Sequence, residues 1–332
     1  MSRNVWIVSN SPPEDGIGSR LLHLSEAVWL GRTFGCSVIV DWRGSVFLED
    51  KSLNYFTEFF VPIPEILGVQ IHYAPSPVLD EYEQAPQSER LELSIAALAE
   101  LVSEPPPTRR YLLTRHSLRL DRSPDHKGYR AFLPDFYRHI IPRPDVAKKL
   151  EAWYEEQLRG HFVVGLNVAT GNGLFSPGAQ LEGHVNTRIL DDEAGFLRTI
   201  AVACERATKD LLPALRSDYK IFFATDSAHM AEVLGRLPRA VTRRTVFPPA
   251  GSGHYFCDYG ALGYSDRAAA ADTIIDMLLL ARCDALVRNS SRFNLYARVT
   301  TGYFNGNVQR FEKLYRALGA EGRQLERGER SR

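Results

Sequence analysis

The sequence predicts an α/β chain built from two Rossmann-like domains that face a central cleft. In the first half of the chain, short apolar runs rich in β-forming residues alternate with helical patterns, and a second such series starts near residue 162. Strands that alternate with helices indicate parallel sheets covered on both faces. The chain has 332 residues, enough for about two domains of roughly 150 residues each.

The composition is that of a soluble globular protein. Hydrophobic residues make up 44% and charged residues 24%, and 40 Lys and Arg balance 40 Asp and Glu. This balance disfavours a dedicated nucleic-acid binder, which usually carries a basic excess. No apolar run has the length of a signal peptide or a membrane span, so we expect a cytoplasmic protein. The spacing of Cys36, Cys204, Cys257 and Cys283 predicts neither a disulfide framework nor a zinc site.

The first half opens as strand, glycine loop, helix and strand. Val5–Ser9 is an apolar run, Ser19–Phe34 has apolar residues at helical spacing, and Ser37–Trp42 is a second apolar run. Gly35 supplies the stop of the helix. Further on, the many prolines of residues 61–86 indicate irregular structure.

The next segments give fewer signals until the second domain begins. Residues 88–103 have the pattern of a helix, whereas residues 108–143 allow no assignment. Pro144 starts a helix that runs to Leu158. We therefore expect an N-terminal domain over residues 1–143, a C-terminal domain over 144–318, and a disordered tail over 319–332.

The second half repeats the alternation of strands and helices. The expected strands are 162–168, 219–225, 245–247 and 285–288. The expected helices are 193–212, 227–237, 266–283 and 292–299. Ligands of open α/β sheets lie beyond the carboxyl ends of the strands. This rule selects the loops 9–18, 41–45, 167–173, 225–229 and 288–291.

Two of these loops belong to the first domain. Gly16 and Gly18 lie between a strand and a helix, where a phosphate can approach the backbone, although an ordinary tight turn explains them equally well. Asp41 and Arg43 flank Trp42 at a strand end. A carboxylate and a guanidinium beside an exposed indole ring suit a sugar. A capping Asp with a partly buried Trp is the alternative.

The remaining loops belong to the second domain, and each has a purely structural alternative. The glycine-rich turn Gly171, Asn172 and Gly173 can form an anion-binding nest or a simple sharp turn. Asp226 with Ser227 can bind a nucleobase or cap a helix. Ser290 and Ser291 can hold a diphosphate or cap a helix. The histidines His184, His229 and His254 have no metal-ligand spacing, so no metal site is predicted.

Together, these segments resemble the rhizobial nodulation fucosyltransferase (NodZ) family and, more distantly, the eukaryotic α-1,6-fucosyltransferases. The matching segments are DGIGSRLLHLSEAVWLGRTFG, VIVDWRGS, VVGLNVATGNG, IFFATDSAH and LLLARCDALVRNSSRFNLYARV. They run in the order of the family and cover both halves. Residues 55–142 match least, and we expect them to carry acceptor specificity.

The resemblance implies a two-domain GT-B-type glycosyltransferase that uses a GDP-sugar without a metal or another cofactor. The C-terminal domain would hold the donor, and the N-terminal domain would face the acceptor. The position of Asp226 reads guanine in the family. The positions of Gly16, Gly18, Ser290 and Ser291 approach the diphosphate.

One departure concerns catalysis. The family has His-x-Arg at the end of the strand that opens the second domain, and its Arg contacts the donor diphosphate. This chain has Asn167, Val168 and Ala169 there. Asn167 can still bond to a base or ribose, but the side chain of Ala169 offers a phosphate nothing. The cations left for that role are Arg43, Arg288, Arg292 and Arg298.

We therefore expect inverting transfer of fucose, or a related sugar, from a GDP donor to an acceptor hydroxyl. The acceptor is an oligosaccharide, a glycolipid or a small molecule, and the candidates for the base are Asp41, Glu182 and His184. A different donor or acceptor, or a nucleotide-sugar-binding protein with little or no transfer activity, are the alternatives.

Overall fold

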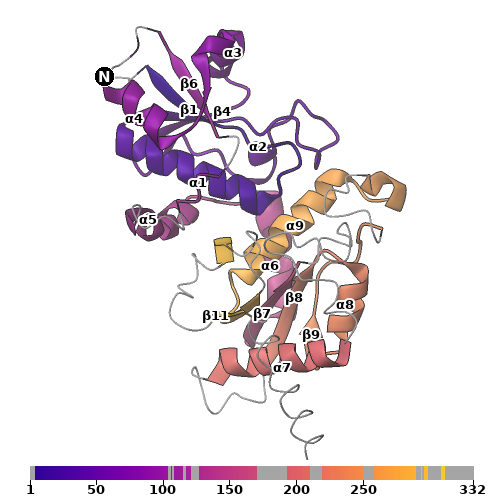
Figure 1. Ribbon diagram of the computed structural model, residues 1–332. Coiled ribbons are helices and arrows are strands. Elements are labelled where there is room, and N and C mark those ends of the chain that lie inside the picture. Colours follow the sequence, from indigo (N-terminus) through magenta and orange to yellow (C-terminus); the bar gives the residue numbers. More distant parts are fainter. Residues whose placement is uncertain are drawn as a thin grey trace, which may run out of the picture. The chain divides into compact units, whose positions relative to one another are not determined.

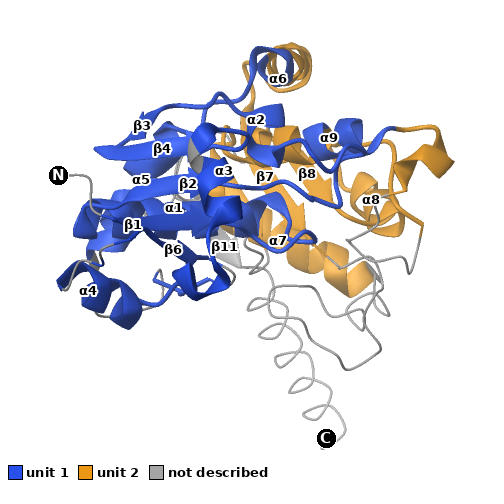
Figure 2. Cartoon of the chain, turned by 90° about the horizontal axis from the view of Figure 1, so that it is seen from above, with its two compact units in different colours: residues 1–147, 265–271 blue, residues 148–264, 272–332 orange. Residues whose placement is uncertain are grey.

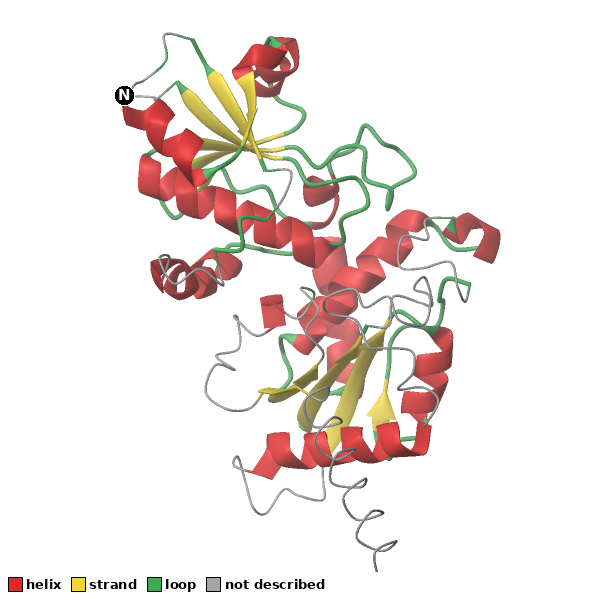
Figure 3. Cartoon of the chain, in the orientation of Figure 1, coloured by secondary structure: helices red, strands yellow, loops and turns green. Residues whose placement is uncertain are grey.

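The computed structural model shows an α/β chain with two separate parallel sheets, each covered by helices (Figures 1 and 3). The structure describes residues 4–103, 106, 108–114, 117–120, 127–169, 193–209, 219–249, 258–288, 293, 295–297 and 308–310. The chain divides into two compact units, coloured in Figure 2. Unit 1 comprises residues 1–147 and 265–271, and unit 2 comprises residues 148–264 and 272–332.

Unit 1 is built on a six-stranded sheet, as far as its residues are described, in the order β3-β4-β2-β1-β6-β5. All neighbours are parallel except β3 and β4. The strands are β1 (Val5–Ser9), β2 (Ser37–Val40), β3 (Glu65–Ile66), β4 (Val69–Tyr73), β5 (Arg90–Glu92) and β6 (Arg110–Leu113). Because β1 lies between β2 and β6, the loops that follow these strands meet at one edge of the sheet.

The helices of unit 1 cover this sheet. They are α1 (Ile17–Phe34), α2 (Tyr55–Phe59), α3 (Pro77–Gln84), α4 (Ile95–Ser103) and α5 (Lys127–Arg138). The long helix α1 packs against β1, β2 and β4 and is buried along most of its length. It ends at Gly35, which has φ +70° and donates its N–H to the carbonyl oxygen of Gly31. This left-handed conformation favours glycine, as the sequence predicts.

Unit 2 is built on a fully parallel sheet, whose described strands follow the order β11-β10-β7-β8-β9. Its strands are β7 (Phe162–Val168), β8 (Tyr219–Thr225), β9 (Ala240–Val241), β10 (Ala285–Arg288) and β11 (Val308–Arg310). Its helices are α7 (Glu193–Lys209), α8 (Ala228–Gly235), most of α6 (Pro144–Gln157) and most of α9 (Asp266–Leu280).

The two faces of the unit 2 sheet are buried by different helices. Leu166 and Val287 face a core that includes Phe196 of α7 and Val233 of α8. On the other face, Trp153 of α6 makes an edge contact with Phe222 of β8. Near the end of α9, a Cβ at Gly165 would lie 3.0 Å from the Sγ of Cys283, so glycine permits this close approach.

Several predicted elements are confirmed, two are wrong and one is confirmed only in part. The strands and helices at the start of the chain are present, as are β7, β8, β10 and the helices α6 to α9. Residues 61–86 are not irregular, because they form β3, β4 and α3. The predicted helix 88–103 is present only over Ile95–Ser103, as α4, and the edge strand β5, which pairs with β6, precedes it. No strand forms at 245–247, because β9 pairs with β8 earlier, at Ala240–Val241.

No helix within the described residues has the length and apolarity needed to cross a membrane. Cys36, Cys204 and Cys283 are free thiols and buried. The predicted tail over residues 319–332 and Cys257 lie outside the described residues.

Candidate functional site

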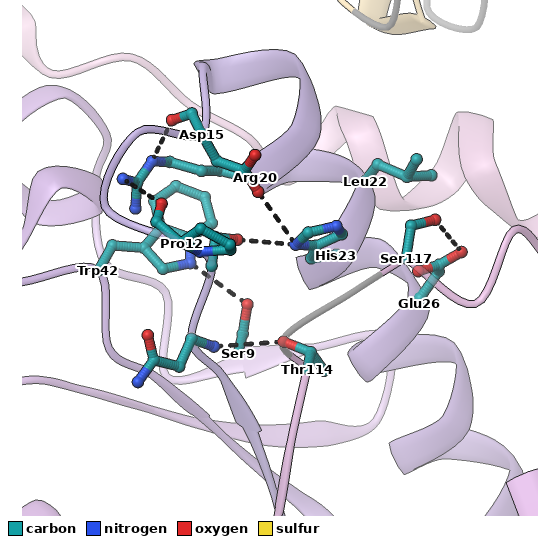
Figure 4. A network of polar contacts seen from close by, with 12 residues as sticks. Ser9, Pro12, Asp15, Arg20, Leu22, His23, Glu26, Trp42, Thr114 and Ser117 are labelled. Atoms are coloured by element: carbon teal, nitrogen blue, oxygen red, sulfur yellow. Dashed lines mark hydrogen bonds and ion pairs between the residues drawn. The ribbon is translucent and has the colours of Figure 1, made fainter. Parts of the chain in front are cut away.

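In unit 1, the loops after β1, β2 and β6 are joined by hydrogen bonds at the carboxyl edge of the sheet (Figure 4). The backbone N–H of Asn10 donates to Thr114 Oγ1 at 3.2 Å, and this hydroxyl donates to the carbonyl oxygen of Val8. The indole N–H of Trp42 donates to Ser9 Oγ at 3.3 Å. These contacts hold the three loops in register where a ligand of an α/β sheet is expected.

The glycine loop leads directly into α1. Gly16 is the N-cap of this helix and is exposed, with φ −71° and ψ 164°. These angles are open to any residue, and a Cβ at Gly16 would meet nothing within 4 Å. The fold therefore does not require glycine at this position. As at any helix start, the first backbone N–H groups of α1 have no partner within the helix. Gly18 is buried in the first turn of α1.

Asp41 and Arg43 are brought together after β2. Arg43 Nε donates to Asp41 Oδ1 at 2.8 Å and Nη2 to Asp41 Oδ2 at 3.1 Å. Arg43 Nη2 also donates to Glu83 Oε1. The hydrogen bond with Asp41 is the main cause that raises the pKa of Arg43 above its ordinary value. Because both oxygens of Asp41 bind this guanidinium, Asp41 is placed as the partner of Arg43.

Of the two alternatives for Trp42, the exposed indole ring is wrong. This side chain is fully buried, at 0% exposure, and packs edge-on against Phe56 of α2. The guanidinium carbon of Arg20 lies 5.8 Å from the centre of the Trp42 ring. The ring faces are therefore covered by the protein, and Trp42 offers no stacking surface to a sugar.

Arg20 was not selected by the sequence analysis, yet it organises the loop before α1. It is fully buried, at 0% exposure. Its Nε donates to the carbonyl oxygen of Asp15 at 2.7 Å, and its Nη2 donates to those of Pro12 and Pro13 at 3.1 and 2.9 Å. Burial lowers the pKa of Arg20. Its position in the first turn of a helix, directly after the glycine loop, is the signal that could have identified it.

Next to the Arg20 side chain lies a second group that the sequence analysis missed. His23 is 2% exposed, and its Nδ1 lies 2.9 Å from Ser11 Oγ and 3.7 Å from Asp15 Oδ2. Figure 4 shows the Asp15 carboxylate turned toward this imidazole. Asp15 itself is 23% exposed, so the pair connects a buried imidazole with the surface of the loop.

In unit 2, the carboxyl ends of β7, β8 and β10 bring Asn167 and Arg288 together. Both are level in the register of β7 and β10, and Asn167 is also level with Ala224 of β8. Asn167 is 3% exposed, and its Nδ2 donates to the carbonyl oxygen of Ala224 at 3.3 Å. Arg288 is buried as well, at 7% exposure. Since level residues on neighbouring strands share a face, these two side chains lie on the same face of the sheet.

Asp226 and Ser227 follow β8. Ser227 is the N-cap of α8, and its Oγ accepts a hydrogen bond from Met230 N at 3.3 Å. The capping role that was open for both residues therefore belongs to Ser227. Asp226 is partly exposed and lies directly before the cap.

A charged cluster on α9 was also missed. Arg243 Nη1 lies 2.6 Å from Asp272 Oδ1, and its Nε lies 3.3 Å from Asp276 Oδ1. Tyr264 OH donates to Asp272 Oδ2. Burial works against the charge of Arg243, but the two carboxylates outweigh it and raise its pKa. Burial and the bond to Asp272 raise the pKa of Tyr264 to about 12.

The other predicted site residues lie outside the described residues. They are Gly171, Asn172, Gly173, Glu182, His184, Ser290, Ser291, Arg292 and Arg298. Across the described ranges, no group of His, Cys, Asp and Glu side chains is arranged to hold a metal ion.

Comparison with known proteins places this architecture among fucosyltransferases. The model of the family Nodulation protein Z (NodZ) matches residues 130–310. Nodulation protein Z of Bradyrhizobium diazoefficiens is 27% identical over 304 residues, which cover 86% of this chain and 76% of that protein.

Two solved structures share the fold. NodZ α-1,6-fucosyltransferase soaked with GDP-fucose has a TM-score of 0.56 and 21% identity, over 90% of this chain and 93% of that chain. POFUT1 in complex with GDP-fucose has a TM-score of 0.53 and 8% identity, over 93% and 98%. These similarities confirm the α/β, GT-B-type fold class that the sequence predicts.

Proposed function

Because the chain belongs to the Nodulation protein Z (NodZ) family, we propose that it is a glycosyltransferase that transfers fucose or a related sugar from a GDP-sugar to an acceptor hydroxyl. Unit 2 holds the donor and unit 1 carries the acceptor side. The reaction inverts the anomeric carbon and needs no metal. A NodZ structure soaked with GDP-fucose supports the choice of donor.

The observation that carries this proposal is the position of Arg288 beside Asn167. The family's arginine would stand at position 169, two residues after Asn167 and directly after the end of β7. Arg288 lies level with Asn167 on β10, the neighbouring strand, at the strand spacing of about 4.8 Å. It therefore supplies a guanidinium at the sheet edge where the family has an arginine and this chain has Ala169.

A cation at this edge has a defined chemical role. When the bond between the sugar and the diphosphate breaks, negative charge grows on the departing phosphate oxygens. A preorganised guanidinium stabilises that charge more in the transition state than in the ground state. Burial of Arg288 strengthens the interaction, because little water competes for the phosphate.

In unit 2, the nucleotide is bound by polar groups at the ends of β7 and β8. Asp226, which directly precedes the N-cap Ser227, accepts hydrogen bonds from the N–H groups of guanine. Asn167 bonds to the base or the ribose. In unit 1, the helix start at Gly16 offers backbone N–H groups to an anionic group, since a Cβ at Gly16 would meet nothing within 4 Å.

One observation favours a second function. Ala169 removes the side chain that contacts the donor diphosphate in the family, and a chain without a replacement would bind the nucleotide sugar and transfer nothing. This nucleotide-sugar-binding role is the alternative. It requires that Arg288 serve only the packing of β10.

A turnover assay separates the two functions. The protein is incubated with GDP-fucose, GDP-mannose or UDP-glucose and a panel of saccharide acceptors, and released nucleoside diphosphate is measured with and without excess EDTA. A transferase releases GDP from a GDP-sugar, and EDTA leaves the rate unchanged. Magnesium-reversible loss would overturn metal independence, and GDP binding without any turnover would establish the alternative.

A second assay tests the guanine contact. GDP should raise the melting temperature more than UDP or ADP does at equal concentration. Asp226→Asn removes a charge-assisted bond of about 1.5–3 kcal/mol, so the GDP Kd should rise about tenfold or more. Glu232→Gln, an exposed carboxylate on α8, is the matched control. Unchanged GDP affinity in Asp226→Asn would contradict the guanine assignment.

A further inference from the structure

The carboxylates near the glycine loop of unit 1 differ in what their oxygens already bind. Glu26 is 1% exposed and accepts hydrogen bonds from Ser117 Oγ and from the backbone N–H groups of Leu118 and Leu120. Its role is therefore to hold the segment after β6. Asp41 binds Arg43 through both oxygens. An arginine stays protonated, so this pair cannot pass a proton on.

Asp15 has a different partner. Its carboxylate lies 3.7 Å from Nδ1 of His23, which is close enough for an ion pair with the imidazole. An imidazole gains and loses a proton near neutral pH, unlike a guanidinium. The side chain of Asp15 is 23% exposed, whereas that of His23 is 2% exposed. Asp15 therefore presents a partly exposed carboxylate at the loop surface, with a buried imidazole behind it whose Nδ1 also lies 2.9 Å from Ser11 Oγ.

The backbone of Asp15 is also fixed from both sides. Its N–H donates to the carbonyl oxygen of Pro12 at 3.0 Å, which closes a turn. Its own carbonyl oxygen accepts a hydrogen bond from the buried Arg20 Nε at 2.7 Å. A reacting group must be held in place before the transition state forms, and this loop supplies such preorganisation.

We propose that Asp15 is the base that takes the proton from the acceptor hydroxyl, an assignment that rests on the proposed function. The acceptor oxygen forms its bond to the anomeric carbon while its proton passes to the Asp15 carboxylate. The bond from the anomeric carbon to the diphosphate breaks, and its electron pair leaves on the phosphate oxygen of GDP. His23 and Arg20 act through Asp15 and are positioning residues.

The test compares Asp15→Asn with Glu14→Gln. Glu14 is the neighbouring exposed residue of the same loop, so its variant removes an equal charge without touching the proposed base. The readout is GDP release from GDP-fucose with the saccharide panel and with water alone as acceptor. Loss of a general base slows a reaction by about 10²–10⁴. Asp15→Asn should lower kcat by at least about 10², while KM for GDP-fucose, GDP affinity and melting temperature stay near the wild-type values.

The outcomes separate the inference from the function on which it rests. A wild-type protein that releases no GDP from GDP-fucose overturns the proposed function and the assignment together. An active wild type with an Asp15→Asn variant of nearly equal kcat overturns the assignment alone. An equal loss in Glu14→Gln would also overturn it, because the effect would then belong to the charge of the loop.

His23 gives a second readout. The side chain of Asn can imitate the Nδ1 position of an imidazole but cannot carry its proton. His23→Asn should therefore keep the fold and the KM for GDP-fucose but lower kcat, whereas His23→Leu should lower both kcat and the melting temperature. If His23→Asn has the kcat of the wild type, the imidazole does not serve Asp15 in proton transfer.

Discussion

Arg20 in unit 1 and Arg243 in unit 2 are both buried, but their guanidinium groups bind different kinds of partner. Arg20 donates to the carbonyl oxygens of Asp15, Pro12 and Pro13, and its guanidinium carbon lies 5.3 Å from the centre of the Tyr55 ring. Arg243 instead pairs with two carboxylates of α9. Burial lowers the pKa of Arg20, whereas the carboxylates raise the pKa of Arg243 despite its burial.

The difference shows what each arginine does for its unit. The loss of Arg20 leaves carbonyl groups without a donor, and the carboxylates that attract it, Asp15 and Glu14, are partly exposed and exposed, respectively. The loss of Arg243 leaves Asp276, which is 4% exposed, with a buried negative charge. The first arginine shapes a loop, and the second neutralises a pair of carboxylates, so their removal should affect the two units very differently.

The largest effect is expected for Arg243→Met. This change keeps the apolar stem but leaves Asp272 and Asp276 unpaired, and removing one partner of a buried pair costs about 3–5 kcal/mol. Urea unfolding followed by fluorescence measures the free energy of unfolding. Adding Asp272→Asn and Asp276→Asn to Arg243→Met should recover part of the loss. A triple variant no more stable than Arg243→Met would contradict this account.

The same variant should acquire a distinct pH dependence. Burial raises the pKa of Asp276 in the folded state, and the attraction of Arg243, which lowers it, is absent in Arg243→Met. A carboxyl with a raised folded pKa stabilises the fold below its unfolded pKa, and this contribution is lost as pH rises through the folded pKa. The penalty of Arg243→Met should therefore be smaller at about pH 5 than at about pH 8. A penalty independent of pH would mean that Asp276 does not titrate in this range.

Substitution of Arg20 should lower the free energy of unfolding less than Arg243→Met does, and it should change hydrogen exchange mainly in the neighbouring loop. Arg20→Met removes donors from three carbonyl groups that water can partly replace, so we expect a loss of about 1–3 kcal/mol. Arg20→Lys should recover little, because one ammonium lacks the planar fork that reaches several carbonyl groups. Hydrogen exchange should rise in residues 10–16 in both variants. A variant with unchanged exchange there would show that the hydrogen bonds of Arg20 are not needed to hold this loop.

The smallest effect is expected for an exposed pair. Arg282 Nη1 donates to Glu151 Oε2 at 2.8 Å, and this bond lowers the pKa of Glu151. A carboxylate with a depressed pKa stabilises the fold above its unfolded pKa and loses that contribution as pH falls. Because solvent screens half-exposed groups, Glu151→Gln should cost at most about 1 kcal/mol. A loss as large as that of Arg243→Met would remove the contrast between buried and exposed pairs.

Much of the fold follows from local patterns in the sequence. The strands Val5–Ser9 and Phe162–Val168 are apolar runs bounded by loops, and Gly35 ends α1 where its position predicts. The edge strand at Arg90–Glu92 was missed because it depends on pairing with Arg110–Leu113, twenty residues further on. Short edge strands take their conformation from the neighbouring strand rather than from their own residues.

The candidate site shows the same limit, because its packing depends on residues far apart in the sequence. The rule on the carboxyl ends of strands selected Asn167 and Arg288, and the structure places these two level in the register. The sequence left the exposure of Trp42 open, because its burial depends on Phe56 and Arg20 packing against the ring. The pairing of Asp15 with His23 likewise requires the turn that the loop makes before α1.

The central claim is that Arg288 supplies the cation that Ala169 lacks in a working glycosyltransferase. The most direct measurement is GDP release from GDP-fucose by the wild type, by Arg288→Gln, and by Arg159→Gln as an exposed control in the same unit. The melting temperature of each variant, with Arg288→Lys measured alongside, shows whether it folds. We predict turnover in the wild type and the control, and a fall in kcat by about 10²–10³ in folded Arg288→Gln. Turnover by Arg288→Gln at the wild-type rate would contradict the role of Arg288, and a wild type that binds GDP without turnover would contradict the transferase itself.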